Sequence, residues 1–131
     1  MTENKTEKGR AARKSGYFAE MKAVLFLRLK GYRILERDFK PPRGSGAGEI
    51  DIVALKGETL VFVEVKKRAA GKDAAAFAVT PAVCRRRVKG AGYYLAVHPE
   101  YAGRAVRFDA VLYGDSGAPQ IIENAWQAES F

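Results

Sequence analysis

The chain has 131 residues and a formal net charge of +8, with 47% hydrophobic and 29% charged residues. These values are typical of one soluble globular domain, and the positive charge favours an anionic partner such as nucleic acid, although charge also simply keeps proteins soluble. One cysteine, Cys84, excludes an internal disulfide, and one histidine, His98, excludes a Cys/His zinc site. This cysteine usage leads us to expect a reducing cytoplasm as the setting. No membrane partner is expected, because no apolar run could span a bilayer and the N-terminus lacks the apolar core of a signal peptide.

The N-terminal part predicts a tail followed by a helix. Residues 1–14 are mostly polar and basic, which predicts a flexible tail before a single domain over residues 15–131. From Ser15, a plausible N-cap, apolar residues recur at helical spacing as far as Gly31, a typical C-cap; they are Phe18, Met21, Leu25 and Leu29. Glu20 lies in the first turns of this helix. An acid at this place is also explained by its favourable interaction with the positive N-terminal end of the helix alone.

A strand and a basic loop come next. Residues 32–39 predict a first strand, and residues 40–48 form a loop rich in Pro, Gly and Ser that contains Lys40 and Arg43. A basic loop at this place could follow a phosphate backbone, and a plain connection is equally compatible with its composition.

Residues 48–55 and 60–66 predict a β-hairpin around a polar turn. A turn centred between Gly57 and Glu58 sets its register. This register pairs Leu55 with Leu60, Asp51 with Glu64, and Glu49 with Lys66.

Side chains alternate along a strand, so one face of the hairpin is apolar and the other becomes charged at one end. The apolar face is predicted to contain Ile50, Ile52, Val61, Val63 and Val65. The other face is predicted to contain Asp51, Val53, Phe62, Glu64 and Lys66. Opposed carboxylates about 5 Å apart repel by about 3 kcal/mol at an effective dielectric of roughly 20. We therefore expect a cation between Asp51 and Glu64, and Mg²⁺ suits this site better than Lys66 alone.

A second helix is predicted after a basic loop that contains Lys67 and Arg68. It begins at Thr80 as N-cap and Pro81 as first residue, and it ends near Val97. The predicted buried stripe is Val83, Val88, Ala91, Tyr94, Leu95 and Val97. The basic side chains are Arg85, Arg86, Arg87 and Lys89. They either bind phosphates or form a solvated face, and the net charge favours phosphates.

Two last strands are predicted, one within residues 103–113 and a short one over residues 120–124. The order of helix, three strands, helix and two strands predicts an α/β fold with a mixed sheet. Cys84 is expected to be a packed residue rather than a nucleophile, and His98 a cap or surface residue.

An Asp followed by Glu-x-Lys on the next strand is the motif of the PD-(D/E)xK nucleases, and the chain resembles them through Asp51, Glu64 and Lys66. It also resembles the YraN family of bacterial proteins, which is grouped with these nucleases and with archaeal Holliday-junction resolvases. The matching segments, in consistent order, are Glu20 and residues 31–37, 48–54, 60–68, 78–81 and 107–111. The chain departs from this family near Val83 and Cys84, where a lysine is frequent, and at Ala19, where the family often has glycine.

The resemblance implies a restriction-endonuclease-like, three-layer α/β fold and a metal-dependent endonuclease that hydrolyses phosphodiester bonds of DNA, including branched or junction DNA. DNA is expected rather than RNA. Mg²⁺ or Mn²⁺ would bind to Asp51, Glu64 and the backbone carbonyl of Val65, with Glu20 completing the site. Lys66 would orient the attacking water or stabilise the developing charge.

Further site residues follow from this resemblance and from the charge pattern. Glu49 competes with Glu20 for its role, or supports Lys66 through a salt bridge. The expected nucleic-acid-binding residues are Arg43, Lys67, Arg68, Arg85, Arg86, Arg87 and Lys89. A homodimer is expected by analogy, since a four-way junction is two-fold symmetric.

Two other classes of function fit the same residues. A nucleic-acid-binding module of the same fold would bind DNA without cutting it, in a salt-sensitive manner that chelators do not affect. An adaptor protein would instead use a sheet edge to form a stable oligomer.

Overall fold

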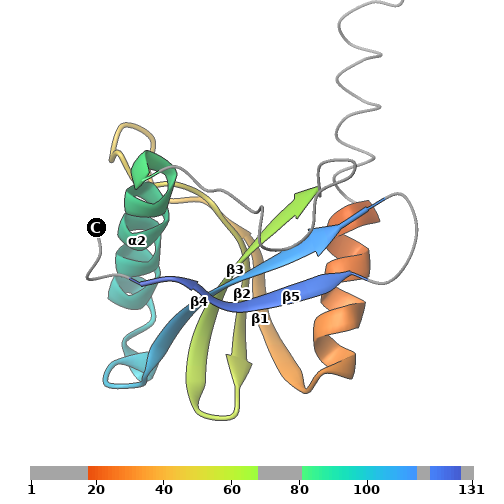
Figure 1. Ribbon diagram of the computed structural model, residues 1–131. Helices are drawn as coiled ribbons and strands as arrows, with labels where there is room; N and C mark the ends of the chain where they lie inside the picture. Colours follow the sequence, from red (N-terminus) through yellow and green to blue (C-terminus); the bar gives the residue numbers. More distant parts are fainter. Residues whose placement is uncertain (1–17, 68–80, 115–118, 128–131) are drawn as a thin grey trace, which may run out of the picture.

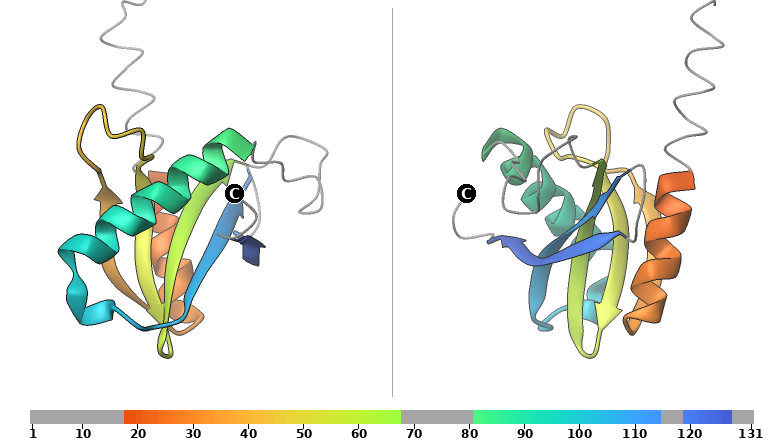
Figure 2. Two further views of the ribbon diagram at one scale, coloured as in Figure 1. Left: turned by 90° about the vertical axis from the view of Figure 1, so that its left-hand side faces the viewer. Right: turned by 45° about the vertical axis from the view of Figure 1, so that its right-hand side comes forward.

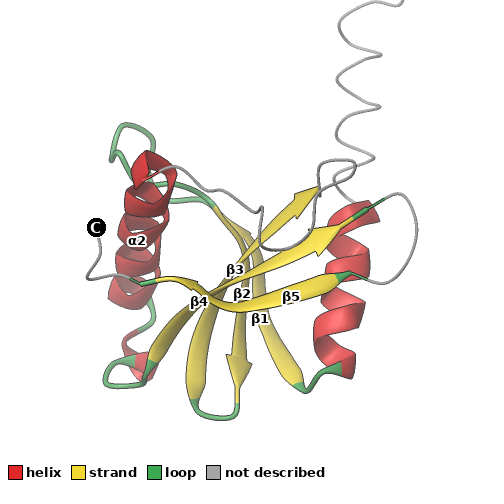
Figure 3. Cartoon of the chain, viewed as in Figure 1, coloured by secondary structure: helices red, strands yellow, loops and turns green. Residues whose placement is uncertain are grey.

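The computed structural model describes residues 18–67, 81–114 and 119–127. The predicted tail at residues 1–14, the N-cap residues Ser15 and Thr80, and Arg68 lie outside these ranges. The described residues form a five-stranded sheet of β1 (Tyr32–Phe39), β2 (Ile50–Lys56), β3 (Thr59–Lys67), β4 (Val106–Tyr113) and β5 (Gln120–Trp126), in that order (Figure 3). β3 and β4 are parallel and the other neighbours antiparallel, so the sheet is mixed, as predicted.

The sheet lies between two helices (Figures 1 and 2). The N-terminal helix covers residues 18–29 and lies on one face, orange in Figure 1. On the other face lies α2 (Pro81–Val97), which is followed by the short 3-10 helix η2 (Pro99–Tyr101) before β4. This three-layer arrangement confirms the predicted α/β fold class.

Each helix packs on one face of the sheet and covers a separate hydrophobic core. Against the N-terminal helix, the buried side chains are Ala23, Val24, Leu27, Tyr32, Ile52, Ala54, Val61, Val63 and Val111. Against α2, they are Ile50, Val53, Leu55, Leu60, Phe62, Cys84, Ala91, Tyr94, Phe108 and Trp126. Strands β2 and β3 contribute to both cores because their side chains alternate between the two faces of the sheet.

The apolar residues that indicated the N-terminal helix do not form its buried face. Phe18, Leu25 and Leu29 are exposed, Leu29 by 85%. The helix instead buries Ala19, Ala23, Val24 and Leu27 against the sheet. Gly31 ends the helix with a φ of +90°, a left-handed conformation that confirms its predicted role as the C-cap.

The predicted register of the hairpin is confirmed from the pair of Leu55 and Leu60 to the pair of Ile52 and Val63. The described strand pairs end there, so they do not include the predicted pairs of Asp51 with Glu64 and of Glu49 with Lys66. The predicted faces are also correct from Ile52 onwards, but the prediction for Ile50 was wrong. Ile50 packs against α2, on the face opposite to Ile52. The cause is a close contact before β2, where the N–H of Gly48 donates to the carbonyl of Arg86 at 2.7 Å and draws this segment toward α2.

Helix α2 ends at Val97, as predicted. Its buried side includes Ala91 and Tyr94 from the predicted stripe, with Val88 and Leu95 partly buried. Val97 does not belong to that stripe, since it is 63% exposed in the last turn of the helix. Cys84 is buried, as expected of a packed residue.

Candidate metal and nucleic-acid site

Three carboxylates meet at one end of the sheet. Glu20 comes from the N-terminal helix, Asp38 from the end of β1 and Asp51 from the start of β2. One ligand atom of each lies within 4.8 Å of the others. We call these three residues the carboxylate cluster. Glu20 and Asp51 were predicted from the sequence, whereas Asp38 was not.

The path of β1 places Asp38 in the carboxylate cluster. A bulge between Ile34 and Glu36 shifts the register of β1 against β2. Beyond the bulge, Arg37 pairs with Ile52 and Phe39 pairs with Ile50. Asp38 itself has a φ of +54°, a left-handed conformation that aspartate tolerates better than most residues. The register of β1 on β2 was the signal that could have identified Asp38.

Burial and mutual repulsion raise two pKa values in this cluster. The pKa of Glu20 rises to about 7, because the carboxyl is desolvated and because it hydrogen-bonds to Asp38 and feels its negative charge. The pKa of Asp51 rises to about 6 through burial and the charge of Glu64, against the opposing effect of a hydrogen bond from Val65. Arg37 lies 3.6 Å from Glu20 and offsets only part of the negative charge. The site therefore holds more negative charge than its surroundings neutralise.

Asp51 also joins the two strands of the hairpin. Its Oδ2 atom accepts a hydrogen bond of 2.8 Å from the backbone N–H of Val65 on β3. The N–H and C=O of one strand residue point toward the same neighbouring strand. The carbonyl of Val65, predicted as a metal ligand, is therefore directed to the side of β3 where Asp51 lies.

Glu64 has a different partner from the one predicted. Both of its carboxylate oxygens accept hydrogen bonds from Arg87 of α2, Oε2 from Nε at 2.9 Å and Oε1 from Nη2 at 3.2 Å. The side chains are only 14% and 19% exposed, respectively. Glu64 is close enough to raise the pKa of Asp51 through its charge, but it is not a member of the carboxylate cluster.

The remaining predicted residues lie at the end of β3, in the loop before β2 and on α2. Lys66 and Lys67 are exposed at the end of β3, and Glu49 is exposed just before β2. Exposed basic side chains of α2 and of the loop before β2 are Arg43, Arg85, Arg86 and Lys89. The loop lies against α2, since a Cβ on Gly46 would be 3.6 Å from Nζ of Lys89. Arg87 differs from its neighbours because it turns inward to Glu64.

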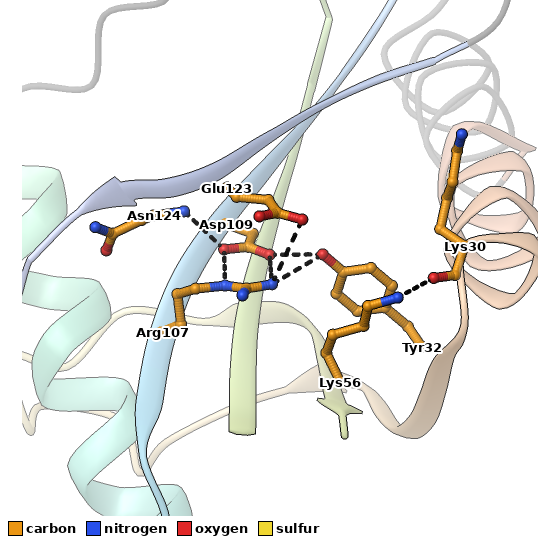
Figure 4. A network of polar contacts seen from close by, with 7 residues as sticks. All are labelled: Lys30, Tyr32, Lys56, Arg107, Asp109, Glu123 and Asn124. Atoms are coloured by element: carbon orange, nitrogen blue, oxygen red, sulfur yellow. Dashed lines mark hydrogen bonds and ion pairs between the residues drawn. The ribbon is translucent and has the colours of Figure 1, made fainter. Parts of the chain in front are cut away.

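A second polar network was not predicted (Figure 4). Asp109 of β4 is fully buried and accepts hydrogen bonds from Arg107 at 2.8 and 2.9 Å, from the hydroxyl of Tyr32 at 2.9 Å and from the backbone of Asn124 at 2.9 Å. Burial and the charge of Asp109 raise the pKa of Tyr32. This network connects β1, β4 and β5, and it contains no member of the carboxylate cluster.

Comparison with known proteins identifies the family. The model of the "Uncharacterised protein family UPF0102" matches residues 19–113. The chain belongs to the UPF0102 family. The predicted YraN resemblance is thereby confirmed, since this is the same family. The chain is 46% identical to the UPF0102 protein amb4503 of Paramagnetospirillum magneticum over 119 residues, which cover 91% of the chain and 92% of that protein.

Other UPF0102 proteins are similar over most of their length. Identity is 44% with the UPF0102 protein of Rhodopseudomonas palustris strain BisA53, over 92% of the chain and 88% of that protein. It is also 44% with the UPF0102 protein of Parvibaculum lavamentivorans, over 91% of the chain and 86% of that protein. The residues that match the UPF0102 model include the carboxylate cluster, Glu64 and Arg87. Among the described residues, no helix is both long and apolar enough to cross a membrane.

Proposed function

We propose that this UPF0102 protein is a metal-dependent nuclease that hydrolyses phosphodiester bonds of DNA. The carboxylate cluster carries this proposal, because Glu20, Asp38 and Asp51 come within 4.8 Å of one another and two of their pKa values are raised. Carboxylates this close repel strongly unless a proton or a cation lies between them. At neutral pH, a divalent cation is the natural counter-charge.

The donor atoms fit Mg²⁺ or Mn²⁺. Both ions prefer hard oxygen ligands, and Mg²⁺ sites typically combine one or two carboxylates with water and phosphate oxygens. Glu20, Asp38 and Asp51 would hold the ion, and the carbonyl of Val65, whose N–H donates to Asp51, would assist. When bound, such an ion polarises a phosphate group and lowers the pKa of a coordinated water.

The chain supplies cations for the substrate around this cluster. Lys66 is exposed at the end of β3, two residues after Glu64, where its ammonium group could neutralise charge that develops on a phosphate. Arg43, Arg86 and Lys89 are exposed on the neighbouring loop and helix. Such side chains bind the DNA backbone independently of sequence. In the proposed nuclease, these cations would bind the DNA backbone while the carboxylate cluster holds the metal.

One observation favours a second candidate, a DNA-binding module that does not cleave. Glu64 is the glutamate of the nuclease motif, yet Arg87 binds both of its oxygens. If this ion pair never opens, only the carboxylate cluster remains for a metal, and the basic surface would serve binding alone.

Cleavage of end-labelled linear, flapped and four-way-junction DNA distinguishes the two candidates. With Mg²⁺ or Mn²⁺, a nuclease should cut at least one substrate, and Asp51→Asn or added chelator should abolish the cuts. Glu58→Gln is the matched control, because Glu58 is an exposed acid in the β2–β3 turn and should leave cleavage unchanged. DNA binding without cleavage under any of these conditions would support the binding module instead.

The proposal includes branched or junction DNA as substrate and a symmetric homodimer as the active species, both by analogy with resolvases. Preference among the three DNA substrates tests the first part. Light scattering of the free protein tests the second, and a monomer that cuts linear DNA as well as junctions would reject both parts.

A further inference from the structure

The ion pair of Glu64 and Arg87 connects β3 to α2 beside the carboxylate cluster. The two hydrogen bonds measure 2.9 and 3.2 Å, and both side chains are largely shielded from water. A two-point contact of this kind between an arginine and a carboxylate is stronger and more directional than an ordinary surface ion pair.

The surrounding backbone makes room for this pair. Gly48, at the start of the hairpin, has no side chain, and a Cβ there would lie 2.8 Å from Nη1 of Arg87. The N–H of Gly48 donates to the carbonyl of Arg86, one residue before Arg87. The guanidinium therefore packs against the loop before β2, β3 and its own helix. Its side chain is 19% exposed, which leaves part of it open to a ligand, whereas Arg85 and Arg86 are exposed on the surface.

This pairing conflicts with a role of Glu64 as a metal ligand. A carboxylate with both oxygens bound to a guanidinium has less negative charge and fewer open lone pairs to offer a cation. Phosphate groups are the other ligands that arginine binds through two parallel hydrogen bonds. Hence a phosphate could replace Glu64 on Arg87 with little loss of hydrogen bonding.

We propose that Arg87 holds Glu64 away from the metal until a phosphate group of the nucleic acid binds the guanidinium in its place. Glu64 is then free to bind the metal. We call this contact between Arg87 and Glu64 the latch. The proposal rests on the proposed nuclease function and assigns Arg87 as a positioning residue within it. Since binding free energies are coupled reciprocally, phosphate binding at Arg87 then strengthens metal binding, and metal binding strengthens phosphate binding. The complete metal site would thus form only on DNA.

The chain contains a reporter of this latch. Trp126 is the single tryptophan, and it lines a crevice too narrow for a water molecule together with Glu64 and Arg87. Its indole N–H has no hydrogen-bond partner among the residues described. Indole fluorescence responds to nearby charges and hydrogen bonds, so it should change when Arg87 separates from Glu64.

The decisive test is a double-mutant cycle on Mn²⁺ affinity, measured by calorimetry without DNA on the wild type, Arg87→Gln, Glu64→Gln and the double variant. If Arg87 keeps Glu64 from binding the metal, Arg87→Gln should tighten Mn²⁺ binding about tenfold when Glu64 is present. It should have a much smaller effect when Glu64 is already Gln. A simple loss of positive charge would instead change affinity equally in both backgrounds.

Two further variants serve as controls. Arg33→Gln removes the same charge from an exposed arginine of β1 and should leave Mn²⁺ affinity nearly unchanged. Arg87→Lys keeps the charge but loses the two-point contact, so it should give an intermediate gain even if Arg87→Gln folds poorly. In a chelator, a short DNA duplex should change the fluorescence of Trp126 in the wild type but not in Arg87→Gln.

The outcomes separate the latch from the nuclease proposal. Equal gains in the two backgrounds, or no gain at all, would overturn the latch while Mn²⁺ binding by the wild type still supports the metal site. If no variant binds Mn²⁺, both the latch and the metal-dependent nuclease fail.

Discussion

Asp38 faces Asp51 across the ladder of β1 and β2, because Arg37 pairs with Ile52 and Phe39 pairs with Ile50 on either side of them. Directly opposed strand residues are close neighbours, and like charges at such positions are destabilising. Glu20 of the N-terminal helix adds a third carboxylate. The metal site that we propose is therefore based on two antiparallel strands and a helix, with Glu64 beside it on Arg87.

Removing one charge from the carboxylate cluster should stabilise the metal-free protein and weaken metal binding. Asp38→Asn keeps a residue that tolerates a positive φ and removes the repulsion, so we expect a gain of about 1 kcal/mol in unfolding free energy at pH 8. Thermal unfolding with chelator measures this gain. Added Mg²⁺ should then raise the melting temperature of the wild type more than that of the variant. A less stable variant in chelator would contradict the predicted repulsion.

Stability should depend on pH in the direction set by Glu20 and Asp51. Their pKa values in the folded protein, about 7 and about 6, exceed the ordinary values of 4.5 and 3.8. The folded state thus binds protons more tightly than the unfolded state, and their contribution to stability is lost as the pH rises from roughly 4 to 7. For Asp51 the loss is at most about 3 kcal/mol.

Asp51→Asn isolates this effect from the titration of other groups. In chelator, the wild type should lose stability relative to the variant between pH 5 and pH 8, so the unfolding free energy of the variant minus that of the wild type should increase. At pH 8, added Mg²⁺ should reduce this difference. Parallel pH profiles of the two proteins would show that Asp51 has an ordinary pKa.

The contact of α2 with the loop before β2 requires glycine at position 90. A Cβ there would lie 2.3 Å from the carbonyl oxygen of Gly48, a backbone atom that cannot rotate away. Gly90→Ala should therefore cost about 1–3 kcal/mol of stability. Gly92→Ala is the matched control in the same helix, since nothing lies within 4 Å of its Cβ, and it should stabilise by about 0.5–1 kcal/mol. Urea unfolding of both variants checks this, and effects of the same sign would argue against the close contact.

The buried Asp109 network should stabilise the fold. Asp109→Ala leaves Arg107, Tyr32 and the N–H of Asn124 without their shared acceptor. Breaking a buried ion pair on one side costs about 3–5 kcal/mol, and the partial exposure of Arg107 favours the lower end. Glu123→Ala should change stability by less than about 0.5 kcal/mol, because the Glu123 side chain is 60% exposed and its carboxylate lies 4.0 Å from Arg107. A small effect of Asp109→Ala in calorimetry would contradict a structural role of this network.

The fold was predictable where local sequence determines structure. The strands follow from their alternating apolar pattern, Gly31 marks the end of the N-terminal helix, and the symmetric turn at Gly57 fixes the pairing of Leu55 with Leu60. The side on which Ile50 packs depends on the close approach of Gly48 to Gly90, two residues that are distant from each other in sequence. Such a long-range contact leaves no local periodic signal.

The same distinction applies to the candidate site. Asp51 and Glu20 could be identified from a motif and a family resemblance. Asp38 depends on the bulge in β1, since the register would otherwise place another residue opposite Asp51. Arg87 could not be separated from Arg85 and Arg86, because only the packing of α2 decides which basic side chain turns toward Glu64.

The most direct test of the proposed metal site is a crystal of the protein soaked in Mn²⁺ and measured for anomalous scattering. We predict an anomalous peak among the carboxylates of Glu20, Asp38 and Asp51, and its loss in Asp51→Asn crystals. Mn²⁺ bound elsewhere, with these three carboxylates unoccupied in the wild type, would contradict the metal site on which the proposed nuclease activity depends.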